Sequence, residues 1–183
     1  MAYTTEAEQG ATKLPVHLVA VNFNDDNNLA FVVRAAAVFG AASVMVIGAM
    51  PPYRTLRQLS VGLSRHVEIV QFLTPEEFVS HCEREDIRIV ALELCEGAAS
   101  LFDFSFGTAP VAIVTGHETT GVPTEILRHA QTVYIPMPGM GRSLNTSQAA
   151  NIAMYEYVRQ QGTENNSLLE PADLLTTYVP PSS

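Results

Sequence analysis

Three segments of the chain combine polar side chains with glycines in patterns suited to binding or catalysis. The first, residues 22–40, reads NFNDDNNLAFVVRAAAVFG and contains Asn28 and Arg34. Arg34 stands in an otherwise apolar helical pattern, and its neighbours in sequence offer it no partner of opposite charge. Such an arginine either extends its head to solvent from the helix face or holds an anion with its planar fork of donors. The segment leaves both uses open.

The second segment, residues 111–127, reads VAIVTGHETTGVPTEIL. An apolar run ends at Gly116, and Gly121 permits backbone conformations that other residues resist. A loop of this kind can present free backbone N–H groups to a carboxylate or hydroxyl of a ligand. An ordinary glycine turn accounts for the same residues. The pattern is not GxGxxG, so it does not predict a dinucleotide site.

The third segment, residues 133–160, contains a loop that leads through Ser143, Leu144 and Asn145 into a long helical pattern. Ser143 or Asn145 could simply be the N-cap of that helix, which is a common use of both residue types. Capping does not explain the residues that crowd the preceding turn, which are Pro136, Met137, Gly139, Gly141 and Arg142.

Apolar runs and amphipathic helical patterns alternate along the chain. The runs are continuously apolar, which is typical of a mainly parallel sheet covered on both faces. Ligands of such sheets bind beyond the carboxyl ends of the strands, and the loops that begin at Gly116 and Pro136 both follow predicted strands. We predict one domain, residues 15–161, between tails at 1–14 and 162–183. The predicted strands are 16–21, 43–47, 67–72, 88–92, 111–115 and 132–135, and the predicted helices are 27–39, 75–84, 124–130 and 145–161.

Composition is that of a globular protein, with 183 residues, of which 47% are hydrophobic and 16% charged. The sequence shows no bilayer-spanning apolar run and no signal peptide, so we expect an intracellular, cytoplasmic protein. Cys82 and Cys95 lack the spacing of a zinc site and are predicted to be reduced thiols.

A formal net charge of −9 argues against binding to nucleic acid unless the few cations are concentrated in one place. Nine of the ten cationic residues are arginines, whose planar fork binds phosphate well. Four basic residues lie within one short stretch: Arg54, Arg57, Arg65 and His66. They are either ordinary surface charges or part of a basic patch.

Together the three segments resemble the three motifs of the SPOUT superfamily, in its SpoU/TrmH branch of RNA ribose 2′-O-methyltransferases. The similarity extends over residues 16–160, and its most specific parts are GHETTG at 116–121, IPM at 135–137 and SLN at 143–145, followed by an alanine-containing helix with Tyr155 and Glu156. The first motif departs from the pattern of many relatives, because Leu29 and Ala30 follow Asn28 and Ala35 follows Arg34.

The resemblance implies an α/β fold with a mainly parallel six-stranded sheet, helices on both faces and a C-terminal trefoil knot. It also implies a homodimer with the site near the subunit interface, and S-adenosylmethionine as the cofactor. The residues that match cofactor-binding positions or motifs are Leu92, Gly116, Glu118, Gly121, Ile135, Met137, Ser143 and Leu144.

By the same resemblance, Arg34, Asn28, Ser143 and Asn145 match catalytic or substrate-facing positions. Arginine is a poor base, since its pKa exceeds about 12, so we expect Arg34 to act electrostatically and leave the general base open. No metal and no membrane is expected. The predicted partner is RNA, with tRNA favoured over rRNA, while a knotted binding module without turnover and an enzyme acting on a non-RNA nucleophile remain alternatives. The predicted RNA-binding residues are Arg34, Arg54, Arg57, Arg65 and Arg142.

Overall fold

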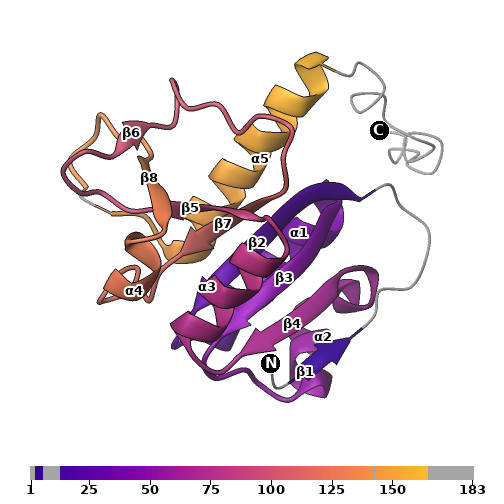
Figure 1. The fold of residues 1–183 in the computed structure, drawn as a ribbon. Helices are drawn as coiled ribbons and strands as arrows, with labels where there is room; N and C mark the ends of the chain where they lie inside the picture. The colour runs from indigo at the N-terminus through magenta and orange to yellow at the C-terminus, as the bar shows by residue number, and fades with distance from the viewer. Residues whose placement is uncertain (1–2, 6–12, 142, 165–183) are drawn as a thin grey trace, which may run out of the picture.

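The protein folds around one eight-stranded sheet, seen in Figure 1 of the computed structural model, which describes residues 3–5, 13–141 and 143–164. The strands are β1 (Tyr3–Thr5), β2 (Leu14–Val21), β3 (Ala41–Ile47), β4 (Glu68–Phe72), β5 (Arg88–Leu92), β6 (Ala99–Ser100), β7 (Val111–Thr115) and β8 (Ala130–Tyr134). Their order across the sheet is β1-β4-β3-β2-β7-β5-β8-β6. All neighbours are parallel except β1 and β4. The prediction of a mainly parallel sheet is confirmed.

The six predicted strands are all present, and two short strands extend the sheet at its edges. β1 lies inside the segment predicted as a tail and pairs antiparallel with β4, with Thr4 opposite Val70. β6 has two residues and pairs with β8. Strands of two or three residues are too short to show the alternation by which a strand is read from sequence. They depend on the backbone of a neighbouring strand that is already in place.

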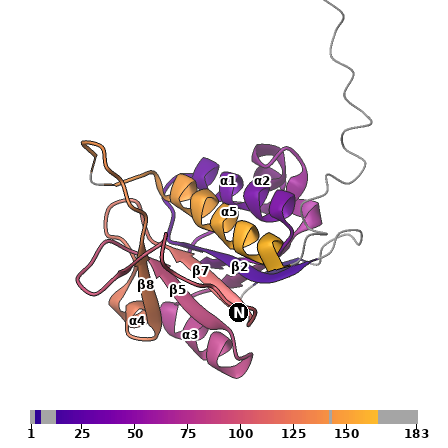
Figure 2. The same cartoon turned by 90° about the horizontal axis from the view of Figure 1, so that it is seen from above.

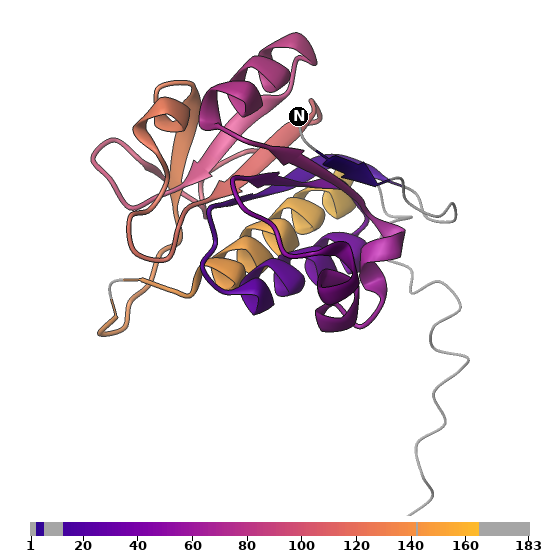
Figure 3. The same ribbon diagram turned by 90° about the horizontal axis from the view of Figure 1, so that it is seen from below.

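Helices cover both faces of the sheet (Figures 2 and 3). On one face lie α1 (Asp26–Phe39), α2 (Tyr53–Leu59), α5 (Thr146–Glu164) and the 3₁₀ helix η1 (Leu63–His66), and on the other lie α3 (Pro75–Arg84) and α4 (Thr124–Leu127). The predicted two-sided covering is confirmed. Among the described residues, no helix is both long enough and apolar enough to cross a membrane.

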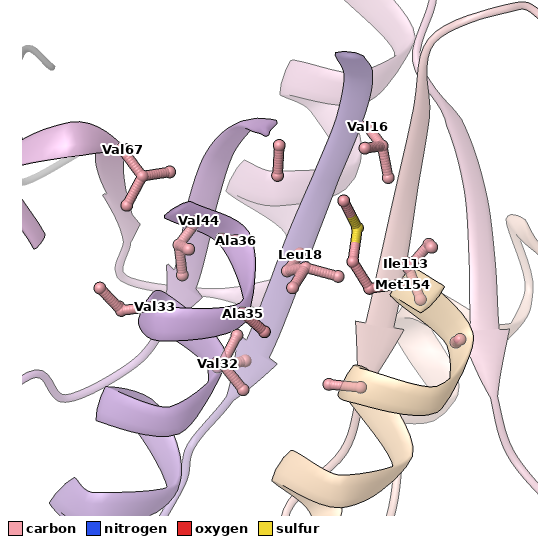
Figure 4. Close-up of a cluster of buried hydrophobic side chains, with 14 of the residues drawn as sticks. Val16, Leu18, Val32, Val33, Ala35, Ala36, Val44, Val67, Ile113 and Met154 are labelled. Carbon is pink, nitrogen blue, oxygen red and sulfur yellow. The ribbon is translucent and has the colours of Figure 1, made fainter. Parts of the chain in front are cut away.

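The core is divided into two layers by the sheet. Figure 4 shows the layer under α1 and α5, where Val32 and Met154 of the helices approach Leu18 of β2. Val19, the next residue of β2, packs instead into the opposite layer with Phe78 of α3. Successive strand residues point to opposite faces, so a strand that is buried on both faces must be apolar throughout. This arrangement explains the continuous apolar runs in the sequence.

Local signals account for most of the helix ends. The Asp25 side chain caps α1 by accepting a hydrogen bond of 2.8 Å from the N–H of Asn27, and Gly40 ends the helix in the left-handed conformation at φ 73°. The helix predicted over 124–130 is shorter, because Ala130 pairs with Ile89 and begins β8. A pairing with a strand 41 residues away leaves no trace in the local pattern.

Candidate active site

A cavity of about 550 Å³ lies at the carboxyl ends of β5, β7 and β8, and we call it the strand-end cavity. These strands are neighbours in the sheet and parallel, so their ends and the loops that follow them meet at one edge. The lining includes every residue predicted to bind the cofactor: Leu92, Gly116, Glu118, Gly121, Ile135, Met137, Ser143 and Leu144. The structure therefore brings these residues together, and their role in binding stays a prediction.

Asn28 links all three motifs by hydrogen bonds. Its Nδ2 donates to Glu118 Oε1 at 2.8 Å, and its Oδ1 accepts from Asn145 Nδ2 at 3.0 Å. The hydroxyl of Ser147 lies 3.5 Å from the same Oδ1. Asn28 is only 6% exposed. Both ends of its amide are thus used within the protein, so Asn28 holds Glu118 and Asn145 in place.

Glu118 is fixed at both carboxylate oxygens. Its Oε2 accepts a hydrogen bond of 3.1 Å from the backbone N–H of Asn24, in addition to the bond from Asn28. Desolvation raises the pKa of Glu118, but hydrogen bonds to its carboxylate, foremost those from Asn24 and Asn28, outweigh it in sum, so the pKa lies below its usual value. The side chain is therefore held as a carboxylate beside the cavity.

The start of α5 is tied to the same network. Asn145 Oδ1 accepts from the N–H of Ser147 at 2.9 Å, so Asn145 is the N-cap that the sequence allowed. Thr146 Oγ1 donates to the carbonyl of Gly116 at 2.9 Å and joins the helix to the loop after β7. Sequence reasoning missed Thr146 and Ser147, although two hydroxyl residues directly after a capping asparagine were an available signal. Ser143 lines the cavity and is exposed.

The loop from Gly116 to Gly121 requires its glycines. A Cβ on Gly116 would lie 2.1 Å from the carbonyl carbon of Gly121 and 2.3 Å from the nitrogen of Val122, which are both backbone atoms. Gly121 has a φ of +71°, a region that side chains disfavour. The loop folds back on itself at this point, so only glycine fits at position 116.

Of the two interpretations that the sequence left open for this loop, the ordinary glycine turn is the one that fits the backbone N–H groups of His117, Thr119, Thr120 and Gly121. The backbones of His117 and Gly121 bond each other in both directions at 3.0 Å. His117 Nδ1 accepts from the N–H of Thr119 at 3.0 Å and from that of Thr120 at 3.3 Å. The loop thus bonds the backbone N–H groups of four of its six residues internally, which holds its shape.

Glu93 is a cavity residue that sequence reasoning missed. It directly follows β5, and its Oε2 accepts a hydrogen bond of 2.9 Å from the N–H of Val122. Its position beyond a strand's carboxyl end was a signal that could have identified it.

Arg34 does not line the strand-end cavity. It is exposed on α1 and borders a second cavity of about 650 Å³ between α1 and α5. Arg34 lies six positions after Asn28 in the helix, which turns their side chains about 120° apart around the helix axis. Within one chain the structure therefore separates Arg34 from the other predicted catalytic residues. The second cavity is lined by Phe31, Arg34, Ala35, Val38, Phe39, Asn151, Ile152 and Tyr155.

Three of the other predicted RNA-binding arginines lie on the same side of the sheet as Arg34. Arg54 and Arg57 are exposed on α2, and Arg65 and His66 are exposed on η1. Arg65 donates through Nε to His66 at 3.0 Å. Within the described residues, neither Arg34 nor Arg54 nor Arg57 forms an ion pair, whereas Arg159 pairs with Glu156 and Arg84 with Glu85. Arg142 lies outside the described residues.

Metal-binding side chains do not cluster in this part of the molecule. In residues 13–141 and 143–162, no group of three or more His, Cys, Asp or Glu side chains could hold a metal ion. Cys82 and Cys95 are both free thiols. Burial raises the pKa of Cys82 to about 12, so this thiol stays protonated in the core.

Comparison with known proteins adds a family to this geometry. Residues 15–155 match the model of the SpoU rRNA Methylase family. A 23S rRNA (guanosine-2′-O-)-methyltransferase RlmB of Acinetobacter baylyi is 35% identical over 75% of this chain and 56% of its own length. The chain spans about half to two thirds of the length of the curated relatives it matches.

Solved structures share the fold. One from work on the 2-OH methylation of C/U34 on tRNA is 29% identical, with a TM-score of 0.72 over 81% of this chain and 97% of the other. The SpoU methyltransferase AviRb from Streptomyces viridochromogenes in complex with AdoMet is 26% identical, with a TM-score of 0.73 over 84% of this chain and 60% of the other. With its three motifs joined by Asn28 and a family match over residues 15–155, the chain belongs to the SpoU rRNA Methylase family.

Proposed function

We propose that the protein transfers a methyl group from S-adenosylmethionine to a ribose 2′-hydroxyl of RNA. The observation that carries the proposal is the convergence of the three motifs on the strand-end cavity, through the bonds of Asn28 to Glu118 and Asn145. These contacts join residues 90 and 117 positions apart in the chain. A network of this kind holds a binding site in one geometry before the ligand arrives.

The cavity suits a ligand of the cofactor's size and polarity. Its volume of about 550 Å³ falls within the usual range of small-molecule sites. Apolar side chains such as Leu92 and Leu144 provide surface for a flat ring, and polar groups such as Ser143 and Glu93 provide hydrogen-bonding partners. The AdoMet complex of AviRb, a protein of the same fold, supports this assignment.

S-adenosylmethionine, when bound, supplies the methyl group for an in-line attack by the ribose oxygen. The protein's task is to hold the reacting atoms in line, and positioning of this kind can account for much of a rate enhancement. The rigid loop from Gly116 to Gly121 and the cap of α5 at Asn145 give the cavity the fixed walls that positioning requires. We propose that Arg34 binds an RNA phosphate and stabilises the negative charge that develops nearby during the reaction. Its guanidinium does not lose a proton, so it acts electrostatically and not as a base.

We propose that the active site is completed by a second copy of the chain. Arg34 borders an exposed apolar surface formed by Phe31 and Val38 of α1 with Ile152 and Tyr155 of α5, and we call this surface the α1/α5 face. Phe31 is 45% exposed, Val38 68% and Tyr155 61%. Exposed apolar surface of this extent is typical of a protein–protein contact. A homodimer through this face would cover it and carry Arg34 toward the partner's site.

The exposed arginines support RNA as the substrate in spite of the acidic total. Arg34, Arg54 and Arg57 lie on one side of the sheet and have no acidic partner among the described residues. Arginines left unpaired on one side of an acidic protein can attract phosphate. We favour tRNA, since the structure from work on C/U34 methylation matches this chain over 97% of its own length. rRNA is the alternative, as the family and the Acinetobacter relative are named for it.

We further expect the C-terminal trefoil knot of the resemblance. The hydrogen bond from Thr146 to the carbonyl of Gly116 holds the start of α5 against the loop after β7. A knot in this region requires these two segments to lie together. We expect the reaction to take place in the cytoplasm, where tRNA and rRNA substrates occur.

Nucleoside mass spectrometry tests the proposal. The purified protein is incubated with S-adenosylmethionine and unmodified total RNA, which is then fractionated into tRNA and rRNA and digested. A 2′-O-methylated nucleoside made by the wild type and not by the Arg34→Ala variant is the expected result. If no methylated nucleoside forms although cofactor binding is shown separately, the proposal is wrong. The protein would then be a binding module or an enzyme with a non-RNA substrate.

A further inference from the structure

Glu93 has one carboxylate oxygen that the protein does not use. Its Oε2 accepts the hydrogen bond from Val122, whereas Oε1 has no hydrogen-bond partner among the described residues. The side chain lines the strand-end cavity and is half-buried. A carboxylate oxygen that the protein leaves without a partner can pair with a ligand that brings a positive charge into the cavity.

The charges around the cavity point the same way. Glu93 and Glu118 are its two acidic lining residues, and none of the described lining residues is lysine or arginine. Glu118 already accepts bonds from Asn28 and Asn24 at both oxygens. His117 Nδ1 already accepts two backbone N–H groups of the loop. Glu93 Oε1 is therefore the carboxylate oxygen left for a ligand.

Glu93 is also held firmly in place. A Cβ on Gly121 would lie 2.4 Å from Glu93 Oε2, so the loop backbone packs directly against the carboxylate. The N–H of Glu93 donates to the carbonyl of Val133 in β8 at 3.0 Å. Both contacts fix the position of the charge before a ligand binds, and a fixed charge discriminates between ligands better than a mobile one.

We propose that Glu93 makes this cavity select S-adenosylmethionine over the demethylated product, S-adenosylhomocysteine. The inference rests on the proposed function. S-adenosylmethionine carries a sulfonium, an ammonium and a carboxylate, so its net charge is positive. Loss of the methyl group turns the sulfonium into a neutral thioether, and the product has no net charge. A carboxylate facing the ligand therefore favours the substrate and weakens the hold on the product, which aids its release.

Calorimetric titration of the full chain with each of the two ligands tests this role. Glu93→Gln removes the charge and keeps an oxygen that can accept the N–H of Val122. Glu96→Gln is the matched control, because Glu96 is exposed, lies three residues away and does not line the cavity. We expect Glu93→Gln to weaken S-adenosylmethionine binding about tenfold and product binding less than about twofold, since hydrogen bonds to charged groups are of this strength. Glu96→Gln should change neither.

Two outcomes would overturn the inference while the proposed function stands. Equal losses for both ligands would mean that Glu93 only shapes the loop, and no loss for either would mean that its carboxylate does not meet the ligand. Thermal unfolding of both variants separates these outcomes from misfolding, because a misfolded variant loses the cooperative unfolding transition of the wild type. If the wild type bound neither ligand, the proposed function would fail together with this inference.

Discussion

The strand-end cavity and the α1/α5 face differ in how much of a site one chain can build. The cavity is lined by both polar and apolar side chains, and its polar side chains already satisfy one another through Asn28, Glu118 and Asn145. The α1/α5 face is largely apolar and exposed, and Arg34 has no ion-pair partner there among the described residues. The buried Oδ1 of Asn151, which borders the same face, has no hydrogen-bond partner either within the described part of the chain.

The two regions are therefore completed by different contacts. Contacts within the chain complete the region proposed to bind the cofactor, and they are dense because ligand selectivity requires a fixed geometry. The region proposed to carry the catalytic arginine lacks such contacts, and an unsatisfied apolar surface is stabilised when another surface covers it. Binding of the cofactor and transfer of the methyl group should therefore respond to different substitutions.

The largest separation is expected for Arg34→Ala. The proposed loss of electrostatic stabilisation should lower the rate of methyl transfer about 100- to 1,000-fold. Affinity for S-adenosylmethionine should change less than about twofold, because Arg34 does not line the strand-end cavity. Single-turnover kinetics measures the first quantity and calorimetry the second. An equal loss of binding and transfer would contradict the separation of the two regions.

Gly116→Ala should instead weaken the binding of S-adenosylmethionine. The added Cβ would meet backbone atoms at 2.1 and 2.3 Å, and backbone cannot move aside as a flexible side chain can. The added methyl group should displace the loop at a cost of about 3 kcal/mol. We therefore expect the protein to bind S-adenosylmethionine about 100-fold more weakly. The α1/α5 face should be unaffected, so sedimentation velocity should show the wild-type oligomeric state.

Gly139→Ala is the matched control for that change. A Cβ at Gly139 meets no atom within 4 Å, and its φ is not in the left-handed region. Calorimetry of this variant should give the wild-type affinity. If both alanine variants bound S-adenosylmethionine normally, the loop at Gly116 would not be part of the cofactor site.

Ile152→Glu tests the α1/α5 face directly. Ile152 is 41% exposed, and a carboxylate in a covered apolar contact would be costly. The dissociation constant of the dimer should rise about 30-fold, which is typical for a central interface residue. Leu73→Glu, an exposed apolar position between β4 and α3, should leave the dimer intact. Analytical ultracentrifugation that shows a monomeric wild type would reject the proposed dimer.

The smallest effect is the acid sensitivity of the network around Glu118. The pKa of Glu118 is lower in the folded protein than its usual value of 4.5. Its carboxylate therefore contributes stability that is fully present above about pH 4.5 and is lost as the pH falls through the lower folded pKa. None of the described residues that line the α1/α5 face is acidic, so the dimer should not share this dependence.

Chemical denaturation of wild type and Glu118→Gln at several pH values isolates that contribution. The difference in the free energy of unfolding between the two proteins should be constant above pH 4.5 and shrink below it. A difference that does not vary with pH would show that the hydrogen bonds from Asn24 and Asn28 do not favour the charged form.

Local sequence patterns were enough for the six longer strands, for four of the helices and for the location of the cavity, but not for β1, β6, α2 or η1. The helix predicted over 75–84 is present as Pro75–Arg84, and the strand predicted over 111–115 as Val111–Thr115. Their apolar spacing, caps and flanking residues are properties of a few consecutive positions, which can be read without knowing what packs against them. The rule that ligands bind beyond parallel strand ends then placed the loops at Gly116 and Pro136 at one site.

Contacts between distant residues required the folded chain. Asn28 and Ser147 are 119 positions apart, and no local pattern shows that their side chains meet. Three other features also could not be read from a local pattern. They are the hydrogen bonds within the 116–121 loop, the carboxylate oxygen of Glu93 that the protein leaves free, and the exposure of Arg34 away from the cavity. The types and order of these residues were visible in the sequence, because propensity and periodicity are local. Their distances, partners and separation into two regions depend on how the sheet and its helices pack, which is a property of the whole chain.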